Sequence, residues 1–438
     1  MGELFQVSAR KKPDQEWAEY PTRTIGHLKG YKKKNRSLGV HLGFSNDKTT
    51  KTGFWHVEKH GDRFWLVDPE GNLNIHRAVC SVSRGSGEDQ KKAFAKKFGT
   101  KEKWGDETVR LLRSHSFNGT GSWTDMITLE SSPLHAVTPL AHTVNLSLMT
   151  DYGKDRSVKV PGHRGYPNDV IFVFEPEFKE FCDKSVARQV AALKEYPNLL
   201  GYFTDNELPF RMNALEGYLK NENPDDAGRK AAEAWLTKRN KTKERIENQD
   251  RWEFLGYLGD TYSSITAAAI RKHDPNHLVL GPRLYGDNRI RAQLMKGIAK
   301  YIDIISFNYY GVWTPLEAQT KGWADWTGKP FMVTEWYTKG EDVGLPNTTG
   351  AGWNVKTQKD RGLFYQNYTL ALLECKNCVG WHWFKYQDND PSHKNPEPSN
   401  IDANKGVVNN DYEPYKDLMD QMRDINEQVF DLIEYFDS

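Results

Sequence analysis

Eight short apolar runs that alternate with helical patterns constrain the fold of this 438-residue chain more than any other feature. Strands that alternate with helices pair in parallel, because the chain crosses back along a helix before the next strand begins. Eight such units predict an α/β protein with a closed (β/α)8 TIM barrel. The predicted strands are residues 73–82, 116–123, 140–149, 199–207, 277–286, 303–311, 330–337 and 378–386.

The beginning of the chain lacks this alternation. Residues 1–52 are polar and rich in lysine, and we expect them to form an N-terminal extension that wraps the barrel. Residues 54–76 contain two aromatic strand-like runs separated by a His-Gly-Asp turn, which predicts a β-hairpin. We expect the catalytic barrel over residues 53–438, with an elaborated, partly helical fourth crossover at 211–262.

The composition argues against several classes of protein. A net charge of +1 gives no electrostatic basis for nucleic-acid binding. The sequence has no apolar run of the length that spans a membrane, which is about 18 residues or more. The first residues contain no apolar signal core. Two alternatives follow: a cytoplasmic protein, or a secreted or periplasmic protein whose signal peptide is not part of this sequence. The Met-Gly start favours the second.

Four cysteines are present, and two of them form a C-x-x-C at Cys375 and Cys378. This motif can belong to a zinc or redox site, but no second C-x-x-C and no H-x-x-x-H accompanies it. We interpret the pair as free thiols or one local disulfide. We therefore expect neither a metal ion nor another cofactor.

Two predicted barrel strands end in glutamate: Glu207 follows Asn206 on the fourth, and Glu335 lies on the seventh. Catalytic residues of such barrels lie at the C-terminal ends of the strands, and these two strands could place carboxylates across the barrel mouth. A separation of about 5–5.5 Å would suit a retaining glycoside hydrolase. Both glutamates lie in apolar runs, and an ionisable side chain is rarely buried there unless it has a partner or a function. We predict these two glutamates as the catalytic pair, one protonated as the acid/base and the other ionised as the nucleophile, with Asn206 binding the sugar 2-hydroxyl.

This pattern resembles that of the clan A retaining glycoside hydrolases, and GYFTDNELPF at 201–210 is similar to the acid/base motif of the family 50 β-agarases. Residues 65–82, 333–340, 358–390 and 404–418 also resemble that family. The resemblance implies that Glu207 is the acid/base and Glu335 the nucleophile. It also implies double-displacement hydrolysis of β-galactosidic linkages in an agarose-like algal galactan or its oligosaccharides. The chain departs from the family at Trp336-Tyr337, where these agarases favour Phe-His.

Two other functions remain open. The same mechanism could act on carrageenan, porphyran or another β-glycan. A barrel that binds carbohydrate without cleaving it would be favoured by the loss of either glutamate, and both are present.

Further residues are candidates for substrate binding. The resemblance implies that Tyr309 or Tyr310 orients the nucleophile and that Trp381 or Trp383 forms a sugar platform, since aromatic faces suit sugar rings. Strand alternation places His382 on the opposite face from the two tryptophans. Arg283 could pair with a sulfate or with a carboxylate such as Asp205. The remaining candidates near the barrel mouth are Asn308, His76, Trp123, His163, Arg164, Gln387 and Asp388.

Overall fold

The computed structural model describes residues 3–45 and 49–438, and it confirms the predicted (β/α)8 barrel. The Met-Gly start and residues 46–48 of the predicted extension lie outside the described residues. Each of the eight predicted runs contains one barrel strand, and the strands close in the order β12-β13-β14-β15-β18-β7-β8-β9. These strands are β7 (His76–Val79), β8 (Gly119–Thr120), β9 (Ala141–Asn145), β12 (Leu199–Asn206), β13 (Leu278–Leu284), β14 (Ile305–Asn308), β15 (Phe331–Trp336) and β18 (Cys378–Trp383).

The chain folds as two compact units. The first unit consists of residues 1–143, 309–320 and 332–438, and the second of residues 144–308 and 321–331. The predicted division into an extension at 1–52 and a barrel at 53–438 remains a prediction.

Two antiparallel hairpins of the first unit lie outside the barrel. The strands β1 (Phe5–Arg10) and β2 (Ala18–Thr22) pair within the predicted extension, and β1 also pairs with β17 (Trp353–Val355), which adjoins β16 (Thr338–Gly340). The predicted hairpin at 54–76 is confirmed. It consists of β4 (His56–His60) and β5 (Arg63–Val67), and the sheet continues through β6 (Asn72–Asn74) to β3 (Phe44–Ser45).

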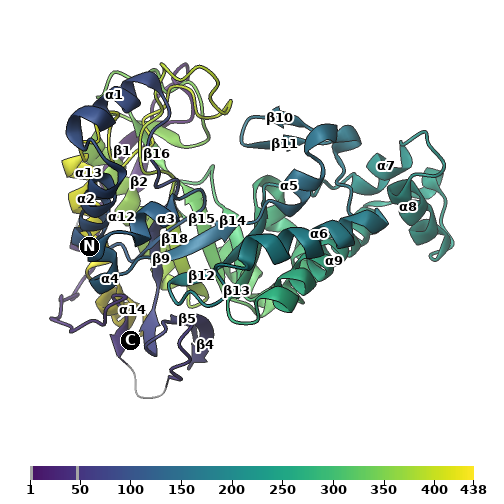
Figure 1. Cartoon of the computed structure of the whole chain (residues 1–438), viewed down its shortest axis with the longest axis horizontal. Helices are drawn as coiled ribbons and strands as arrows, with labels where there is room; N and C mark the ends of the chain where they lie inside the picture. Colours follow the sequence, from purple (N-terminus) through teal and green to yellow (C-terminus); the bar gives the residue numbers. More distant parts are fainter. Residues whose placement is uncertain (1–2, 46–48) are drawn as a thin grey trace. The chain divides into compact units, whose positions relative to one another are not determined.

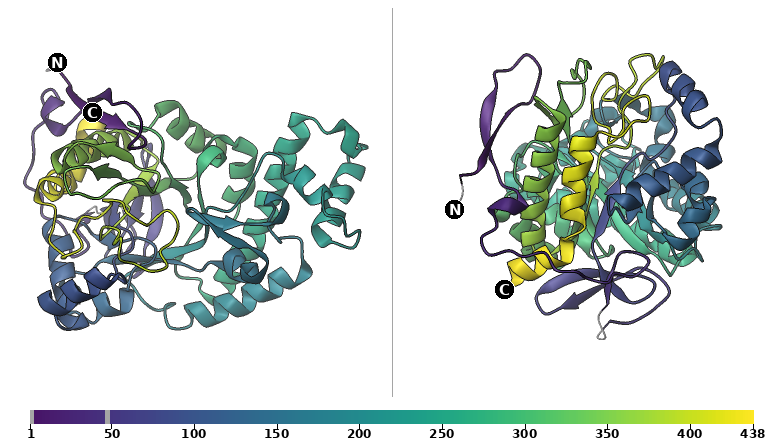
Figure 2. Two further views of the ribbon diagram at one scale, coloured as in Figure 1. Left: turned by 90° about the horizontal axis from the view of Figure 1, so that it is seen from above. Right: turned by 90° about the vertical axis from the view of Figure 1, so that its left-hand side faces the viewer.

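Helix α12 (Gln358–Glu374) is the most deeply buried long helix of the first unit. The Thr357 side chain caps its N-terminus by accepting a hydrogen bond from the Asp360 backbone N–H. Figure 2 shows α12 in green alongside α13 (Lys416–Asn426) in yellow, and the two helices are in contact. The other helices of this unit are η1 (Ile25–His27), α1 (Glu88–Lys97), α2 (Lys101–Ser114), α3 (Met126–Glu130), α4 (Pro133–Val137) and α14 (Val429–Asp437).

The second unit contains the elaborated crossover that the sequence predicts between the fourth and fifth barrel strands. It holds α7 (Ala214–Leu219), α8 (Ala227–Thr237), η4 (Lys243–Arg245) and α9 (Asn248–His273). Helix α9 packs against both α6 (Pro176–Val190) and α10 (Ala292–Ala299), and Figure 1 shows α6 and α9 side by side. The shorter elements are α5 (Leu148–Tyr152), η2 (Lys154–Arg156), β10 (Val158–Val160), β11 (His163–Gly165), η3 (Pro167–Asp169) and η5 (Gly286–Ile290).

One helix is shared between the units, because α11 (Glu317–Thr327) begins in the first and ends in the second. Among the described residues, no helix has both the length and the apolar character that crossing a membrane would require.

Candidate active site

Glu207 directly follows β12 in the second unit and is 7% exposed. Its backbone has a φ of 51°, in the left-handed region that side chains other than glycine adopt rarely, so this conformation stores strain. Its N–H donates to the carbonyl oxygen of Arg283 at 3.1 Å, and its Oε1 accepts from Asn308 Nδ2 at 2.8 Å. The end of the strand therefore holds a buried carboxylate in a defined position.

Asn206, the residue before Glu207, is oriented by two donors. Its Oδ1 accepts from Arg283 Nη1 at 2.9 Å and from Asn308 Nδ2 at 3.1 Å. These bonds fix which end of the amide is the oxygen, so the Nδ2 group must act as the donor. That group donates to the Gly162 carbonyl at 3.2 Å. The structure thus brings three predicted residues, Asn206, Asn308 and Arg283, together around Glu207.

Asp205 is not the ion-pair partner of Arg283 that the sequence offered as one alternative, because its carboxylate binds other groups. The Asp205 carboxylate accepts from the backbone N–H groups of Met149 and Thr150 at 2.8 and 2.9 Å and from the Tyr262 hydroxyl at 2.6 Å. Burial raises the pKa of Asp205 to about 6. This carboxylate fastens α5 and α9 to β12, while Arg283 binds Asn206.

Glu335 lies on β15 in the first unit and is 6% exposed. Its Oε2 accepts a hydrogen bond from the Tyr310 hydroxyl at 2.7 Å. Tyr309 does not have this role, because its hydroxyl donates to Gln319 Oε1 at 2.8 Å and accepts from the Leu316 N–H. Of the two tyrosines that the sequence left as alternatives, Tyr310 is therefore the one that binds Glu335.

A row of aromatic rings extends from Tyr310 within the first unit. The ring centroids of Tyr310 and Tyr337 are 5.4 Å apart, those of Tyr337 and Phe384 5.9 Å, and those of Phe384 and Trp123 6.1 Å. Trp123 is 43% exposed, whereas Tyr337 and Phe384 are buried. Trp123 is thus the predicted residue that offers an accessible aromatic face, and Phe384 and Tyr337 are residues that sequence reasoning missed.

Lys405 is a further residue near Glu335 that the sequence did not identify as part of the site. Its Nζ lies 5.1 Å from the Tyr337 ring centroid and donates to the Ser399 carbonyl at 2.6 Å. Burial lowers the pKa of Lys405 well below its usual value, and the charges of Lys385 and Lys339 lower it further, whereas Glu335 opposes this shift.

Trp381 and Trp383 do not fit the predicted sugar platform. Both side chains are fully buried. The Trp381 indole N–H donates to the Tyr365 hydroxyl of α12 at 2.8 Å. The Trp383 indole N–H donates to the Lys405 carbonyl at 3.0 Å. His382 faces the other way, as alternation predicts, and its Nε2 lies 2.8 Å from Nδ1 of His76. The tryptophans therefore pack beneath a helix, and their faces have no room for a sugar.

Asp388 and Gln387 also belong to the framework of the first unit. The Asp388 carboxylate accepts from Asn404 Nδ2 at 2.9 Å, from the Gly406 N–H at 2.7 Å and from the Tyr415 hydroxyl. The Gln387 amide donates to the Asn409 carbonyl at 3.2 Å. These contacts hold the segment 404–415 in place, so the expectation that Asp388 reaches a substrate hydroxyl does not fit.

The remaining histidine and arginine candidates separate into two groups. His76 begins β7, at the end of the strand opposite to the predicted mouth, and is fully buried. His163 lies on the β10–β11 hairpin, and its Nε2 is 3.2 Å from the Tyr285 hydroxyl. Arg164 Nη1 donates to the Ser157 carbonyl at 3.4 Å, which braces the same hairpin. Tyr285 was missed, although its place directly after β13 is the signal that could have found it.

The four cysteines are free thiols, which agrees with one of the two forms expected for the C-x-x-C. Burial raises the pKa of the Cys375 and Cys378 thiols, which disfavours the reactive thiolate. In residues 3–45 and 49–438, no group of three or more His, Cys, Asp or Glu side chains could hold a metal ion.

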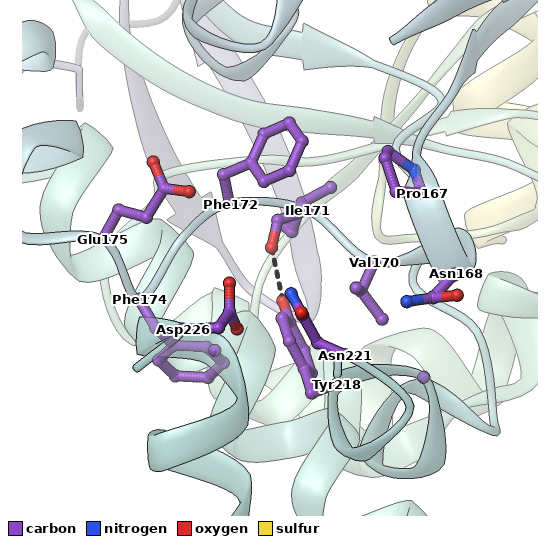
Figure 3. A pocket seen from close by; sticks show the side chains of 12 residues that line it. Pro167, Asn168, Val170, Ile171, Phe172, Phe174, Glu175, Tyr218, Asn221 and Asp226 are labelled. Carbon is purple, nitrogen blue, oxygen red and sulfur yellow. Dashed lines mark hydrogen bonds between the residues drawn. The ribbon is translucent and has the colours of Figure 1, made fainter. Parts of the chain in front are cut away.

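A separate small pocket lies in the second unit and is shown in Figure 3. Phe172, Phe174 and Asp226 are among its lining residues, and the Tyr218 hydroxyl donates to the Ile171 carbonyl at 2.6 Å in its wall. None of the predicted catalytic or substrate-binding residues lines this pocket, so it is distinct from the surroundings of Glu207.

Comparison with known proteins places these features in context. No protein-family model matches the chain. The chain is 24% identical to β-agarase B of Vibrio sp. (strain JT0107) over 368 residues and 24% identical to β-agarase A of the same organism over 376 residues. These matches cover 75% and 74% of the chain but 36% of each relative, so the chain corresponds to about a third of their length.

Solved structures match over more of their length. The crystal structure of BpGH50 is 30% identical, with a TM-score of 0.88, and the match covers 99% of this chain and 96% of that one. The agarase AgWH50C and an exo-β-agarase have TM-scores of 0.72 and 0.73 at 18% and 19% identity. Each of these two matches covers 93% of this chain, with 68% of AgWH50C and 69% of the exo-β-agarase, and both support the fold alone.

Proposed function

Because the chain belongs to glycoside hydrolase family 50, we propose that it is a retaining β-glycosidase that cleaves β-galactosidic linkages of an agarose-like galactan or its oligosaccharides. The observation that carries this proposal is the pair of buried glutamates at the ends of barrel strands β12 and β15. The β-agarases of Vibrio sp. support the choice of galactan.

In the proposed mechanism, Glu207 is the acid/base. In its protonated form it donates a proton to the glycosidic oxygen, so that the departing sugar leaves as a neutral alcohol. Asn308 supports this role by donating to Glu207 Oε1, which holds the carboxyl group in one orientation. Asn206, with its amide oriented by Arg283, is placed to donate to the 2-hydroxyl of the sugar under attack.

Glu335 is the proposed nucleophile. Its carboxylate attacks the anomeric carbon as the glycosidic bond breaks, and a covalent glycosyl-enzyme forms. The Tyr310 hydroxyl bonds to Oε2 and so holds the carboxylate in one orientation with a charge-assisted hydrogen bond. In the second step Glu207 takes a proton from water, which attacks the same carbon and releases the sugar with its configuration retained.

Two glutamate variants test this proposal. Glu335→Ala and Glu207→Gln should each lower kcat on agarose oligosaccharides by about 10³-fold or more, because each removes one half of the mechanism. Circular dichroism and thermal melting should show that both variants remain folded. Near-normal turnover by either variant would show that the assignment of the two roles is wrong.

Product analysis tests the stereochemistry and the substrate. NMR of fresh product should show the β anomer first, whereas an initial α anomer would exclude retention. The substrate screen should include agarose, porphyran and carrageenans. Cleavage of one of the latter two alone would move the specificity to a sulfated galactan, and binding without cleavage would favour a carbohydrate-binding barrel.

A further inference from the structure

The β10–β11 hairpin lies against the acid/base residue within the second unit. Its turn contains Gly162, whose carbonyl accepts the hydrogen bond from Asn206 Nδ2 at 3.2 Å. A Cβ atom on Gly162 would lie 3.0 Å from Glu207 Oε2, and the residue has a φ of +83°. Glycine is therefore required here both for the turn and for the close approach to the carboxylate. Figure 1 shows the hairpin as β10 and β11.

Three polar side chains continue from this turn. His163 Nε2 lies 3.2 Å from the Tyr285 hydroxyl, and the two ring centroids are 5.2 Å apart. Arg211 Nη2 donates to the same hydroxyl at 3.0 Å. His163 comes from the hairpin, Tyr285 from the segment after β13 and Arg211 from the segment after β12. All three side chains are only half-buried. They form a connected polar surface, here called the Tyr285 cluster, that begins beside Glu207.

The charge state of the Tyr285 cluster suits the binding of hydroxyl groups. Burial raises the pKa of Tyr285; the Arg211 charge opposes this shift, and the Glu207 carboxylate adds to it. The tyrosine therefore remains a neutral phenol that can both donate and accept. In the part of the chain that the structure describes, no carboxylate pairs with Arg211, so its remaining N–H donors are not consumed by an ion pair.

We propose that the Tyr285 cluster is the subsite that binds the leaving-group sugar of the galactan. The inference rests on the proposed function, in which Glu207 protonates the glycosidic oxygen. The sugar on the far side of that oxygen must then pass next to Glu207. Tyr285 supplies an aromatic ring with a polar edge, and Arg211 and His163 supply hydrogen-bonding groups, which is the chemistry that recognises a sugar ring.

The experiment compares substrates with and without a leaving-group sugar. Wild type and the variants Tyr285→Phe and Arg211→Gln are assayed on an agarose oligosaccharide and on a 4-nitrophenyl glycoside with the same glycone. The matched control is Tyr257→Phe, an exposed tyrosine on α9. We expect kcat/KM on the oligosaccharide to fall about 10-fold to 100-fold in the two cluster variants, because hydrogen bonds to the sugar are lost. The aryl glycoside should lose less than about twofold, since nitrophenol forms no such bonds.

A binding measurement gives a second readout that does not depend on the aryl substrate. In the Glu335→Gln background, calorimetry should show that Tyr285→Phe weakens binding of the oligosaccharide by about tenfold or more. An equal loss on both substrates, or unchanged oligosaccharide binding, would overturn the subsite. If wild type cleaves neither substrate while the oligosaccharide still binds through Tyr285, the proposed function fails and the sugar-binding surface stands.

Discussion

At the residue scale, the two tyrosines after β14 have different roles although they are neighbours in sequence. Tyr310 donates to the carboxylate of Glu335, whereas Tyr309 is fully buried and bonds to Gln319 on α11. Since successive side chains point to opposite sides of an extended backbone, only one of the pair could face Glu335. No pattern in the letters Tyr-Tyr says which.

This difference makes a matched pair of variants informative. Tyr310→Phe should lower kcat by about 10-fold to 100-fold with little change in melting temperature, because the hydrogen bond that orients the proposed nucleophile, Glu335, is lost. Tyr309→Phe should instead lower the melting temperature and leave the kcat of the folded enzyme within about twofold of wild type. Steady-state kinetics and calorimetry on both variants check the assignment. A larger fall in kcat for Tyr309→Phe than for Tyr310→Phe would contradict it.

At the element scale, β18 shows how one strand divides its side chains between the barrel and the surrounding helices. Trp381 and Trp383 lie on the helix side, and Trp336 of β15 joins them by stacking on Tyr368 of α12 at 4.2 Å. Trp336 follows Glu335, so the aromatic residue next to the proposed nucleophile packs against α12.

Substitution of Trp381 tests this packing role. Trp381→Phe removes the indole N–H that donates to Tyr365 and leaves a small void, so the free energy of unfolding should fall by about 1–3 kcal/mol. The KM for oligosaccharides should stay within about twofold of wild type. Urea unfolding and kinetics together measure both effects. A stable variant with a strongly raised KM would restore Trp381 as a sugar platform.

At the scale of the whole molecule, buried histidines couple the stability of the first unit to pH. Burial lowers the pKa of His41, His76 and His135 to about 4 and lowers that of His142 as well. Their unfolded-state pKa is about 6.5, so between pH 6.5 and pH 4 the unfolded chain binds more protons than the folded one. The contribution of these histidines to the free energy of unfolding is fully present above pH 6.5 and decreases as the pH falls, by up to about 3 kcal/mol for each of His41, His76 and His135.

Urea unfolding at pH 7, 5.5 and 4.5 checks this coupling. The free energy of unfolding should decrease steadily with pH in the wild type, and the decrease should be smaller in His135→Asn. His393→Gln, at a half-exposed loop position, provides the control. A wild-type stability that is flat over this range would contradict the assignment of neutral buried histidines.

The sequence predicted the barrel well because its evidence is periodic and local. Alternation of apolar strands with helices depends on neighbouring residues, and all eight predicted runs contain a barrel strand. The same logic placed Asn206 and Glu207 at the end of one strand, where Asn308 and Arg283 from the next two strands contact them. Residues at the strand ends could therefore be predicted to lie together, because every parallel strand of a barrel ends on the same face.

Only the tertiary structure decided whether a side chain near a strand end contacts the two glutamates or packs into the surrounding framework. The sequence by itself determined the eight strands, the elaborated crossover and the two glutamates at strand ends. It did not determine that Trp381 and Asp388 belong to the framework, that Tyr310 rather than Tyr309 binds Glu335, or that Gly162 lies against Glu207. Each of these depends on a contact between segments far apart in the chain, and such contacts form only when the packed strands, helices and loops fix which partner each side chain meets.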